Sequence, residues 1–368
     1  MAELYKKIWK KKNLMKYIGD TLQVAGAIPS ILTNGKANGV KATHVMTGSG
    51  LEYYVLPGRG MDIPLAFFKG KPLSFYSGTG ITSPAYYEEP GLKWLRSFCV
   101  GLLTTCGISY SGAPCDDNGT LLGLHGRVAN SEAENFSITQ EWKEDEYCIS
   151  LKGMMREASS MNEYITLKRT VESKLGSSSI KIHDVIENRG FEPQPIMMLY
   201  HINFGFPLLS PNSELIIPTL KTEARDEEAK KDRGVEECRI FGEPVNAYQE
   251  KGFFHIPVAE PNGTTMVGIV NFDTGDGTPL GLSIKYNVNQ LPKLFQWKII
   301  REGFYVCGIE PGMAYPMGRK AVRERDELIM LNGQEEYKID LEINVFDTMV
   351  EINTFKDYVE KIVKDRFR

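Results

Sequence analysis

Histidine changes charge closest to neutral pH, so each of the five histidines in this 368-residue chain is a candidate acid or base. His201 lies in the segment Tyr200-His201-Ile202-Asn203. If this segment is a strand, His201 and Asn203 project from one face, and Tyr200 and Ile202 from the other. A polar pair on an otherwise apolar strand fits a ligand site and a hydrogen-bonded core histidine equally well. The segment alone leaves both interpretations open.

Glu310 closes an apolar segment that begins at Phe304 and runs into Pro311. A glutamate at a strand end usually faces solvent. If it is partly buried instead, its pKa rises toward a value useful to a general base. Shortly before it, Trp297 and Lys298 place an aromatic ring next to a cation. Sugar sites combine aromatic faces with fixed polar groups in this way.

The other histidines carry weaker signals. His125 is flanked by Gly123 and Gly126, which permit close approach of a ligand or of another backbone, and Arg127 shares its face if a strand continues there. A glycine-rich strand end is also commonplace. His183 alternates with Ile180 and Ile182, so we expect it to face solvent. His44 and His255 are interpreted as ordinary surface or core residues.

The segment Gly58-Arg59-Gly60-Met61-Asp62 is the remaining polar cluster. It fits a tight turn closed by an Arg59–Asp62 pair, or a ligand contact, about equally. The chain has no G-x-S-x-G, P-loop, H-E-x-x-H or dinucleotide-binding motif.

Composition narrows the class of partner. The net charge of -4 makes nucleic acid a poor partner, and the sequence predicts no membrane span and no signal peptide, which indicates a cytoplasmic protein. The six cysteines are scattered without metal-site spacing and are interpreted as free thiols. We expect a small-molecule ligand, no metal or organic cofactor, and a monomer or homodimer.

Short alternating segments separated by turn residues predict an all-β sandwich in which these side chains are held. The clearest predicted strands are 51–56, 147–151, 164–171, 179–186, 265–270, 282–286 and 337–345. Helical periodicity is confined to an N-terminal extension (1–20), a charged insertion (223–237) and the C-terminus (353–368). No linker or repeat interrupts the pattern, so we expect one domain over residues 1–368.

Taken in order, the motifs around Arg59, His125, His201, Trp297 and Glu310 resemble those of the galactose mutarotase-like (aldose 1-epimerase) superfamily. The resemblance covers roughly residues 51–345 and is greatest for a bacterial branch known mainly as a domain of unknown function. It implies a β-supersandwich with a sugar on its concave face.

The resemblance also assigns roles. It implies Glu310 as the base, His201 as the acid and His125 as a hydroxyl-binding histidine, with an arginine supplied by Arg59 or Arg127. Asp62, Asn203, Trp297 and Lys298 complete the expected substrate-binding set. The sugar-binding aspartate of better-known mutarotases has no obvious counterpart, and Arg225 and Glu250 are the nearest polar candidates. The implied activity is anomer interconversion by ring opening. Epimerisation at another carbon, or sugar binding without catalysis, are the alternatives.

Overall fold

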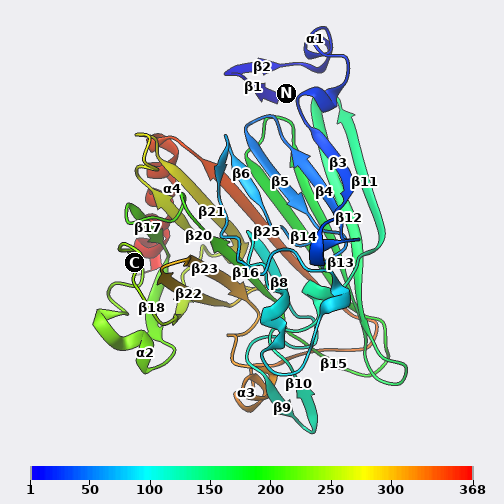
Figure 1. Cartoon of the computed structure of the whole chain (residues 1–368), viewed down its shortest axis with the longest axis vertical. Coiled ribbons are helices and arrows are strands. Elements are labelled where there is room, and N and C mark those ends of the chain that lie inside the picture. The colour runs from blue at the N-terminus through cyan, green and yellow to red at the C-terminus, as the bar shows by residue number, and fades with distance from the viewer. Residues whose placement is uncertain (1, 367–368) are drawn as a thin grey trace.

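Three antiparallel β-sheets form most of the molecule in the computed structural model, which describes residues 2–366 (Figure 1). The eight-stranded sheet contains, in spatial order, β11 (Glu134–Lys143), β12 (Glu146–Ala158), β13 (Tyr164–Lys174), β14 (Ser179–Asn188), β25 (Glu336–Phe346), β21 (Leu280–Asn287), β20 (Thr264–Asn271) and β17 (Ser213–Ile216). The six-stranded sheet contains β18 (Thr219–Ala224), β19 (Lys251–Pro257), β22 (Lys293–Arg301), β23 (Phe304–Gly312), β16 (Leu199–Phe204) and β8 (Leu103–Cys106). The five-stranded sheet contains β3 (Gly26–Ile31), β4 (Lys41–Met46), β5 (Leu51–Val55), β6 (Ala66–Phe68) and β7 (Lys71–Pro72).

The eight-stranded sheet packs against both other sheets, and one apolar core joins all three. Buried hydrogen bonds cross the layers. The hydroxyl groups of Tyr53 in β5 and Ser173 in β13 lie 2.9 Å apart, and the Tyr200 hydroxyl in β16 donates to Asp184 in β14 at 2.6 Å. Strands of the eight-stranded sheet alternate between buried and exposed residues, as expected for a sheet with one solvated face. The predicted all-β sandwich is confirmed.

Every strand predicted from alternation lies within or largely within an observed strand. The turn at Gly176 joins β13 to β14 as an antiparallel hairpin, and the turn at 273–277 joins β20 to β21. Solvent exposure of His183 is also confirmed, because its side chain is 46% exposed and its Nδ1 contacts Asp340.

The helical prediction for residues 1–20 is wrong in its main part. Strands β1 (Ala2–Leu4) and β2 (Lys7–Trp9) form a hairpin, and only α1 (Lys11–Leu14) is helical, as seen at the top of Figure 1. Tyr5 and Lys6 turn the chain with φ of 54° and 61°, and Trp9 Nε1 donates to the Leu4 carbonyl. A two-residue turn with positive φ closes a hairpin, which the lysine-rich pattern did not reveal.

The other two predicted helices are present but shifted. The charged insertion contains α2 (Glu227–Lys230), and residues 223 and 224 belong to β18. The C-terminal helix α4 (Met349–Arg366) buries Phe355, Val359 and Ile362 against the sheet, while residues 367–368 lie outside the described part. The remaining elements are α3 (Arg319–Glu324), β9 (Cys115–Asp117), β10 (Thr120–Leu122), β15 (Gln194–Ile196), β24 (Ile329–Leu331) and the 3₁₀ helices η1 (Thr21–Gln23), η2 (Gly35–Ala37), η3 (Pro84–Tyr86), η4 (Lys93–Ser97), η5 (Val128–Asn130) and η6 (Lys231–Arg233).

All six cysteines are free thiols, in agreement with the sequence interpretation. Across residues 2–366, no helix is long and apolar enough to cross a membrane.

Candidate functional site

His201 and Glu310 are brought together by the pairing of β16 with β23. The register joins Ile202 with Ile309, so the two polar side chains occupy neighbouring positions on the same sheet face. Nε2 of His201 lies 3.3 Å from Oε1 of Glu310, and the side chains are only 5% and 1% exposed. The contact lacks hydrogen-bond alignment, because within the described residues neither carboxyl oxygen of Glu310 nor Nδ1 of His201 has a hydrogen-bond partner. Glu310 is therefore buried, and the ordinary expectation for a strand-end glutamate does not apply to it.

The pair lies in a cavity of ≈ 520 Å³ on the six-stranded sheet. Aromatic rings surround His201: its ring centroid is 5.3 Å from that of Phe98 and 5.3 Å from that of Trp297. The lining consists of Leu92, Trp94, Leu95, Phe98, Ala113, Pro114, Leu124, His125, His201, Arg225, Glu250, Phe295, Trp297, Glu310 and Pro316. A few convergent polar groups in an otherwise apolar hollow are typical of a small-molecule site.

His125 reaches this cavity from a loop. Strand β10 ends at Leu122, and His125 has the left-handed φ of 59°, so the predicted strand continuation is wrong. Its ring lies 5.8 Å from that of His201, and its Nδ1 is buried without a hydrogen-bond partner among residues 2–366. The glycines beside it admit another backbone: a Cβ on Gly126 would lie 2.2 Å from a carbonyl oxygen, and one on Gly123 would lie 1.9 Å from another. Close packing of main chains therefore places His125.

Asn203 and Gly308 occupy the positions next to His201 and Glu310 on the same face of the sheet. They are cross-strand partners, and Asn203 donates to the carbonyl oxygens of Gly101 (3.0 Å) and His201 (2.9 Å). A Cβ at Gly308 would come within 3.1 Å of both Glu310 Oε1 and His201 Cε1. Asn203 thus fixes the backbone of the strand that carries His201, and glycine at 308 leaves room for the side chains of His201 and Glu310.

Burial dominates the electrostatics of Glu310. Loss of water raises the pKa of its carboxyl well above the usual value, Arg225 opposes this change and Glu250 adds to it. Burial likewise lowers the pKa of His201 to about 3, helped by the nearby His125, whereas Asn203 acts in the opposite direction. The pKa of His125 falls to about 4 through burial. Burial thus favours uncharged imidazoles and a protonated carboxyl at this site.

Arg225 and Glu250 form the charged rim. Arg225 Nη2 donates to Glu250 Oε1 at 2.9 Å, and its Nε donates to Asp226 at 2.7 Å. Trp297 Nε1 donates to the second Glu250 oxygen at 3.0 Å. These hydrogen bonds hold the Trp297 ring against the cavity. Arg225 and Glu250 are also the residues named above as the nearest polar candidates for the missing aspartate.

Two of the expected substrate-binding residues are committed to the protein interior. The guanidinium of Arg59 donates to the carbonyl oxygens of Thr82, Ser97 and Ala129 and to the Asn130 side chain, and it does not line the cavity. The turn predicted at this segment is present, since Asp62 N donates to the Arg59 carbonyl, but the predicted ion pair is not formed.

Asp62 belongs instead to a buried network between the sheets. One of its oxygens accepts from Thr105 Oγ1 at 2.7 Å and lies 3.5 Å from Arg169 Nη1. Burial raises the pKa of Asp62 to about 6, although Arg169 and Thr105 pull it down. We therefore assign Arg59 and Asp62 to the framework and not to sugar binding.

Arg127 and Lys298 also point away from the cavity. Arg127 forms ion pairs with Glu157 (2.7 Å) and Glu89 (2.5 Å), because the loop at His125 turns its side chain elsewhere. Lys298 follows Trp297 in β22, and successive residues of a strand face opposite sides, so the two cannot share one site. Alternation alone could have excluded Lys298 once Trp297 was chosen.

Trp94 and Phe98 were missed by sequence reasoning. They belong to η4 and the residue after it, where no pattern separates a wall of a cavity from ordinary core. Their burial against His125 and His201 became visible only in the folded chain.

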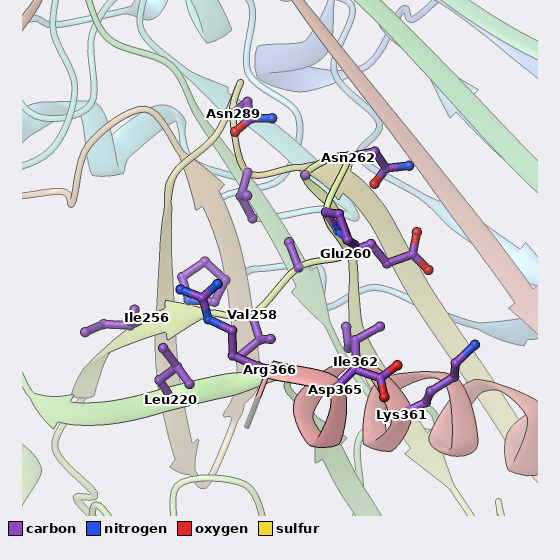
Figure 2. A pocket seen from close by; sticks show the side chains of 15 residues that line it. Leu220, Ile256, Val258, Glu260, Asn262, Asn289, Lys361, Ile362, Asp365 and Arg366 are labelled. Carbon is purple, nitrogen blue, oxygen red and sulfur yellow. The ribbon is translucent and has the colours of Figure 1, made fainter. Parts of the chain in front are cut away.

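A larger hollow of ≈ 780 Å³ lies beside the end of α4 (Figure 2). Its side chains come from β18, β19, the loop after β19, the segment after β21 and α4, and none of the described residues lining it is a histidine or cysteine. Within residues 2–366, no three His, Cys, Asp or Glu side chains are arranged to hold a metal ion. Buried histidines next to a buried carboxyl are therefore a feature of the smaller cavity and not of this hollow.

Solved structures share this architecture. A Klebsiella pneumoniae protein provisionally named an aldose 1-epimerase superposes with a TM-score of 0.85 at 24% identity, covering 97% of this chain and 96% of that one. A galactose mutarotase-like protein from Clostridium acetobutylicum gives 0.59 at 14% identity, with 89% and 100% covered. The galactose 1-epimerase of Lactobacillus acidophilus gives 0.52 at 11% identity, with 88% and 99% covered. At these identities the likeness shows the galactose mutarotase-like fold.

No curated protein is similar enough in sequence to match the chain. Residues 37–345 match a family described as a domain of unknown function, DUF4432, and this range contains the strands of all three large sheets except β3 and the last residue of β25. This match covers most of the chain and agrees with the bacterial branch suggested by the motifs. The chain therefore belongs to the DUF4432 family and has the galactose mutarotase-like fold.

Proposed function

We propose that this protein is a sugar mutarotase of the aldose 1-epimerase type. The observation that carries the proposal is the His201–Glu310 pair, which lies at 3.3 Å in an aromatic cavity with three nitrogen and oxygen atoms lacking hydrogen-bond partners within the described chain. Unsatisfied buried polar atoms are costly in a stable fold, so their clustering supports a ligand with hydroxyl groups.

The reaction needs one base and one acid. In the proposed mechanism Glu310 takes the proton of the anomeric hydroxyl while His201 gives a proton to the ring oxygen, so that the bond from C1 to the ring oxygen breaks and a carbonyl forms at C1. Rotation about C1–C2 and closure with the roles reversed yields the other anomer. The proposed pair uses a single shared proton, and the raised pKa of Glu310 together with the lowered pKa of His201 favours Glu310 as its holder before sugar binds. Sugar hydroxyls that donate to Glu310 would stabilise its carboxylate and shift that proton to His201.

The surrounding groups would position the sugar. Trp297 offers an aromatic face held by Glu250, and His125 offers a free ring nitrogen. Fixing the sugar between these groups lowers the entropic cost of reaching the reactive geometry.

Exchange between anomers measured by NMR on a panel of aldoses tests the proposal. Glu310→Gln and His201→Ala should both slow catalysed exchange, whereas His183→Gln, an exposed histidine on the eight-stranded sheet, should leave it unchanged. Equal exchange in all four proteins contradicts the assignment. Sugar-dependent thermal stabilisation without exchange would identify a binding protein instead.

One observation favours a second candidate, an epimerase acting at a carbon next to a carbonyl group. A C–H proton is far less acidic than an anomeric hydroxyl and needs a stronger base, and the strongly raised pKa of Glu310 suits such a step. A new sugar, seen in the same NMR spectra, would identify this activity.

A further inference from the structure

Two lysines are buried on the side of the six-stranded sheet opposite to the candidate site. Lys251 in β19 and Lys298 in β22 are direct cross-strand partners and are only 5% and 6% exposed. Directly opposed side chains on one face of a sheet lie close together, so two ammonium groups share this buried position.

Backbone carbonyl oxygens provide most of the hydrogen bonds to these two groups. Lys298 Nζ donates to Glu237 O at 3.0 Å and to Ile240 O at 2.7 Å, while Lys251 Nζ donates to Lys231 O at 2.7 Å. An ammonium group has three donors, so one remains on Lys298 and two on Lys251 after these bonds.

The carboxylates near the lysines do not balance their charge. Within the described residues Lys298 forms no ion pair, and Lys251 has only Asp232, at 3.9 Å, whose side chain is 93% exposed. Glu237 directs its carboxylate to Arg233, 3.6 Å away. Burying two like charges costs several kcal/mol for each ion.

Aromatic rings offset only part of this cost. Lys298 Nζ lies 5.0 Å from the ring centroid of Phe241, and Lys251 Nζ lies 5.6 Å from that of Tyr248. Such contacts stabilise an ammonium group by less than its burial costs. The pKa of Lys298 is accordingly lowered by burial, with Lys251 adding to the effect. The one ion pair of these lysines among the described residues, Lys251 with the exposed Asp232 at 3.9 Å, leaves the two buried charges largely unbalanced.

Lys251 and Lys298 line a separate cavity of ≈ 300 Å³, to which η6 and the segment after it contribute Asp232 and Glu237. We propose that this cavity binds a small oxyanion, a phosphate or carboxylate group, between Lys251 and Lys298. The free N–H donors would form charge-assisted hydrogen bonds with its oxygens, and its charge would neutralise the buried pair. The site is distinct from the sugar cavity, because Trp297 and Lys298 face opposite sides of β22.

Titration calorimetry of the full chain with inorganic phosphate, and separately with acetate, tests this site at constant ionic strength. We expect saturable binding of at least one anion, and phosphate binding without acetate binding would assign the site to phosphate groups. Lys251→Met and Lys298→Met should each weaken binding by about tenfold or more, since a charge-assisted hydrogen bond is lost. Lys181→Met, on an exposed lysine of the eight-stranded sheet, should have no effect. Asp232→Ala should strengthen binding, because it removes a carboxylate that lies 3.9 Å from Lys251 Nζ and competes with the anion.

A second measurement needs no variant. Mass spectrometry after lysine acylation of the wild-type protein should show that the bound anion protects Lys251 and Lys298 but not Lys181. Absence of saturable binding by both anions, or affinity unchanged in both methionine variants, overturns the proposal. Neither readout depends on mutarotase activity, so failure of the proposed function would leave this result intact.

Discussion

Glu310→Gln keeps the shape of the side chain and removes its ability to exchange a proton. General acid or base catalysis by one positioned group contributes about 10²- to 10⁴-fold in rate, so we expect catalysed anomer exchange to fall by that factor. The side chain has no hydrogen-bond partner within residues 2–366, so the replacement breaks no hydrogen bond there and changes only the 3.3 Å approach of His201. Exchange rates from NMR at saturating sugar give the comparison.

Stability provides an independent check with a definite sign. The pKa of Glu310 is higher in the folded chain than in the unfolded chain, so this group stabilises the fold below about pH 4.5, and that contribution is lost as pH rises through the folded value. Glutamine is uncharged throughout. The free energy of unfolding of Glu310→Gln relative to wild type should therefore increase from pH 4.5 upward, by up to about 1.4 kcal/mol per pH unit, until the folded pKa is passed.

Urea titrations between pH 4.5 and 8 measure this difference. A difference that does not change with pH would show that Glu310 is not a buried, neutral carboxyl. Exchange activity within about tenfold of wild type would refute its catalytic role, given the range for a positioned acid or base.

Three further predictions concern the groups around this pair. Burial lowers the pKa of His125 to about 4, so its contribution to stability should be complete above about pH 6.5 and lost as pH falls through 4. Nitrogen-15 NMR should find a neutral His125 ring at pH 5. His125→Gln should reduce the loss of stability at acid pH that urea titrations measure. Trp297→Phe keeps an aromatic face but loses the hydrogen bond to Glu250, so KM should rise about tenfold while kcat changes little, as steady-state exchange kinetics would show; a selective fall in kcat would contradict this positioning role. In Gly126→Ala (φ +80°) the new Cβ would lie 2.2 Å from a carbonyl oxygen, so the free energy of unfolding should fall by about 3 kcal/mol or more. Gly119→Ala has a similar φ (+82°) but open space around it, and should cost only about 1 kcal/mol. Equal shifts in melting temperature for the two variants would refute the close-packing argument.

Local patterns in the sequence identified much of the sheet and part of the site. Alternation located β13 and β14 and the turn between them, because exposure of one sheet face imposes a period of two. The same rule placed His201 on a face of its own strand opposite Tyr200, and the structure has Tyr200 in the core between the sheets. Such features depend on neighbours along the chain.

The N-terminal hairpin shows where these patterns fail. Its lysines and apolar residues fit a helix as well as a strand. The turn uses positive φ at Tyr5 and Lys6, and without a glycine at either position the sequence does not indicate a turn there. In the folded chain Leu4 of this hairpin is buried in the main core, a tertiary contact that the local pattern does not contain.

The chain of residues by itself determined that His201 and Glu310 are candidates and that an all-β fold carries them. Only the tertiary structure decided that these two side chains lie 3.3 Å apart and that Trp94 and Phe98 line the same cavity. It also decided that the Arg59 guanidinium donates its hydrogen bonds to backbone carbonyl oxygens. The physical reason is that burial and partnership depend on register between strands far apart in sequence. The pKa of Glu310 and the hydrogen-bond partners of Arg59 depend on those neighbours, so a local sequence pattern cannot predict either.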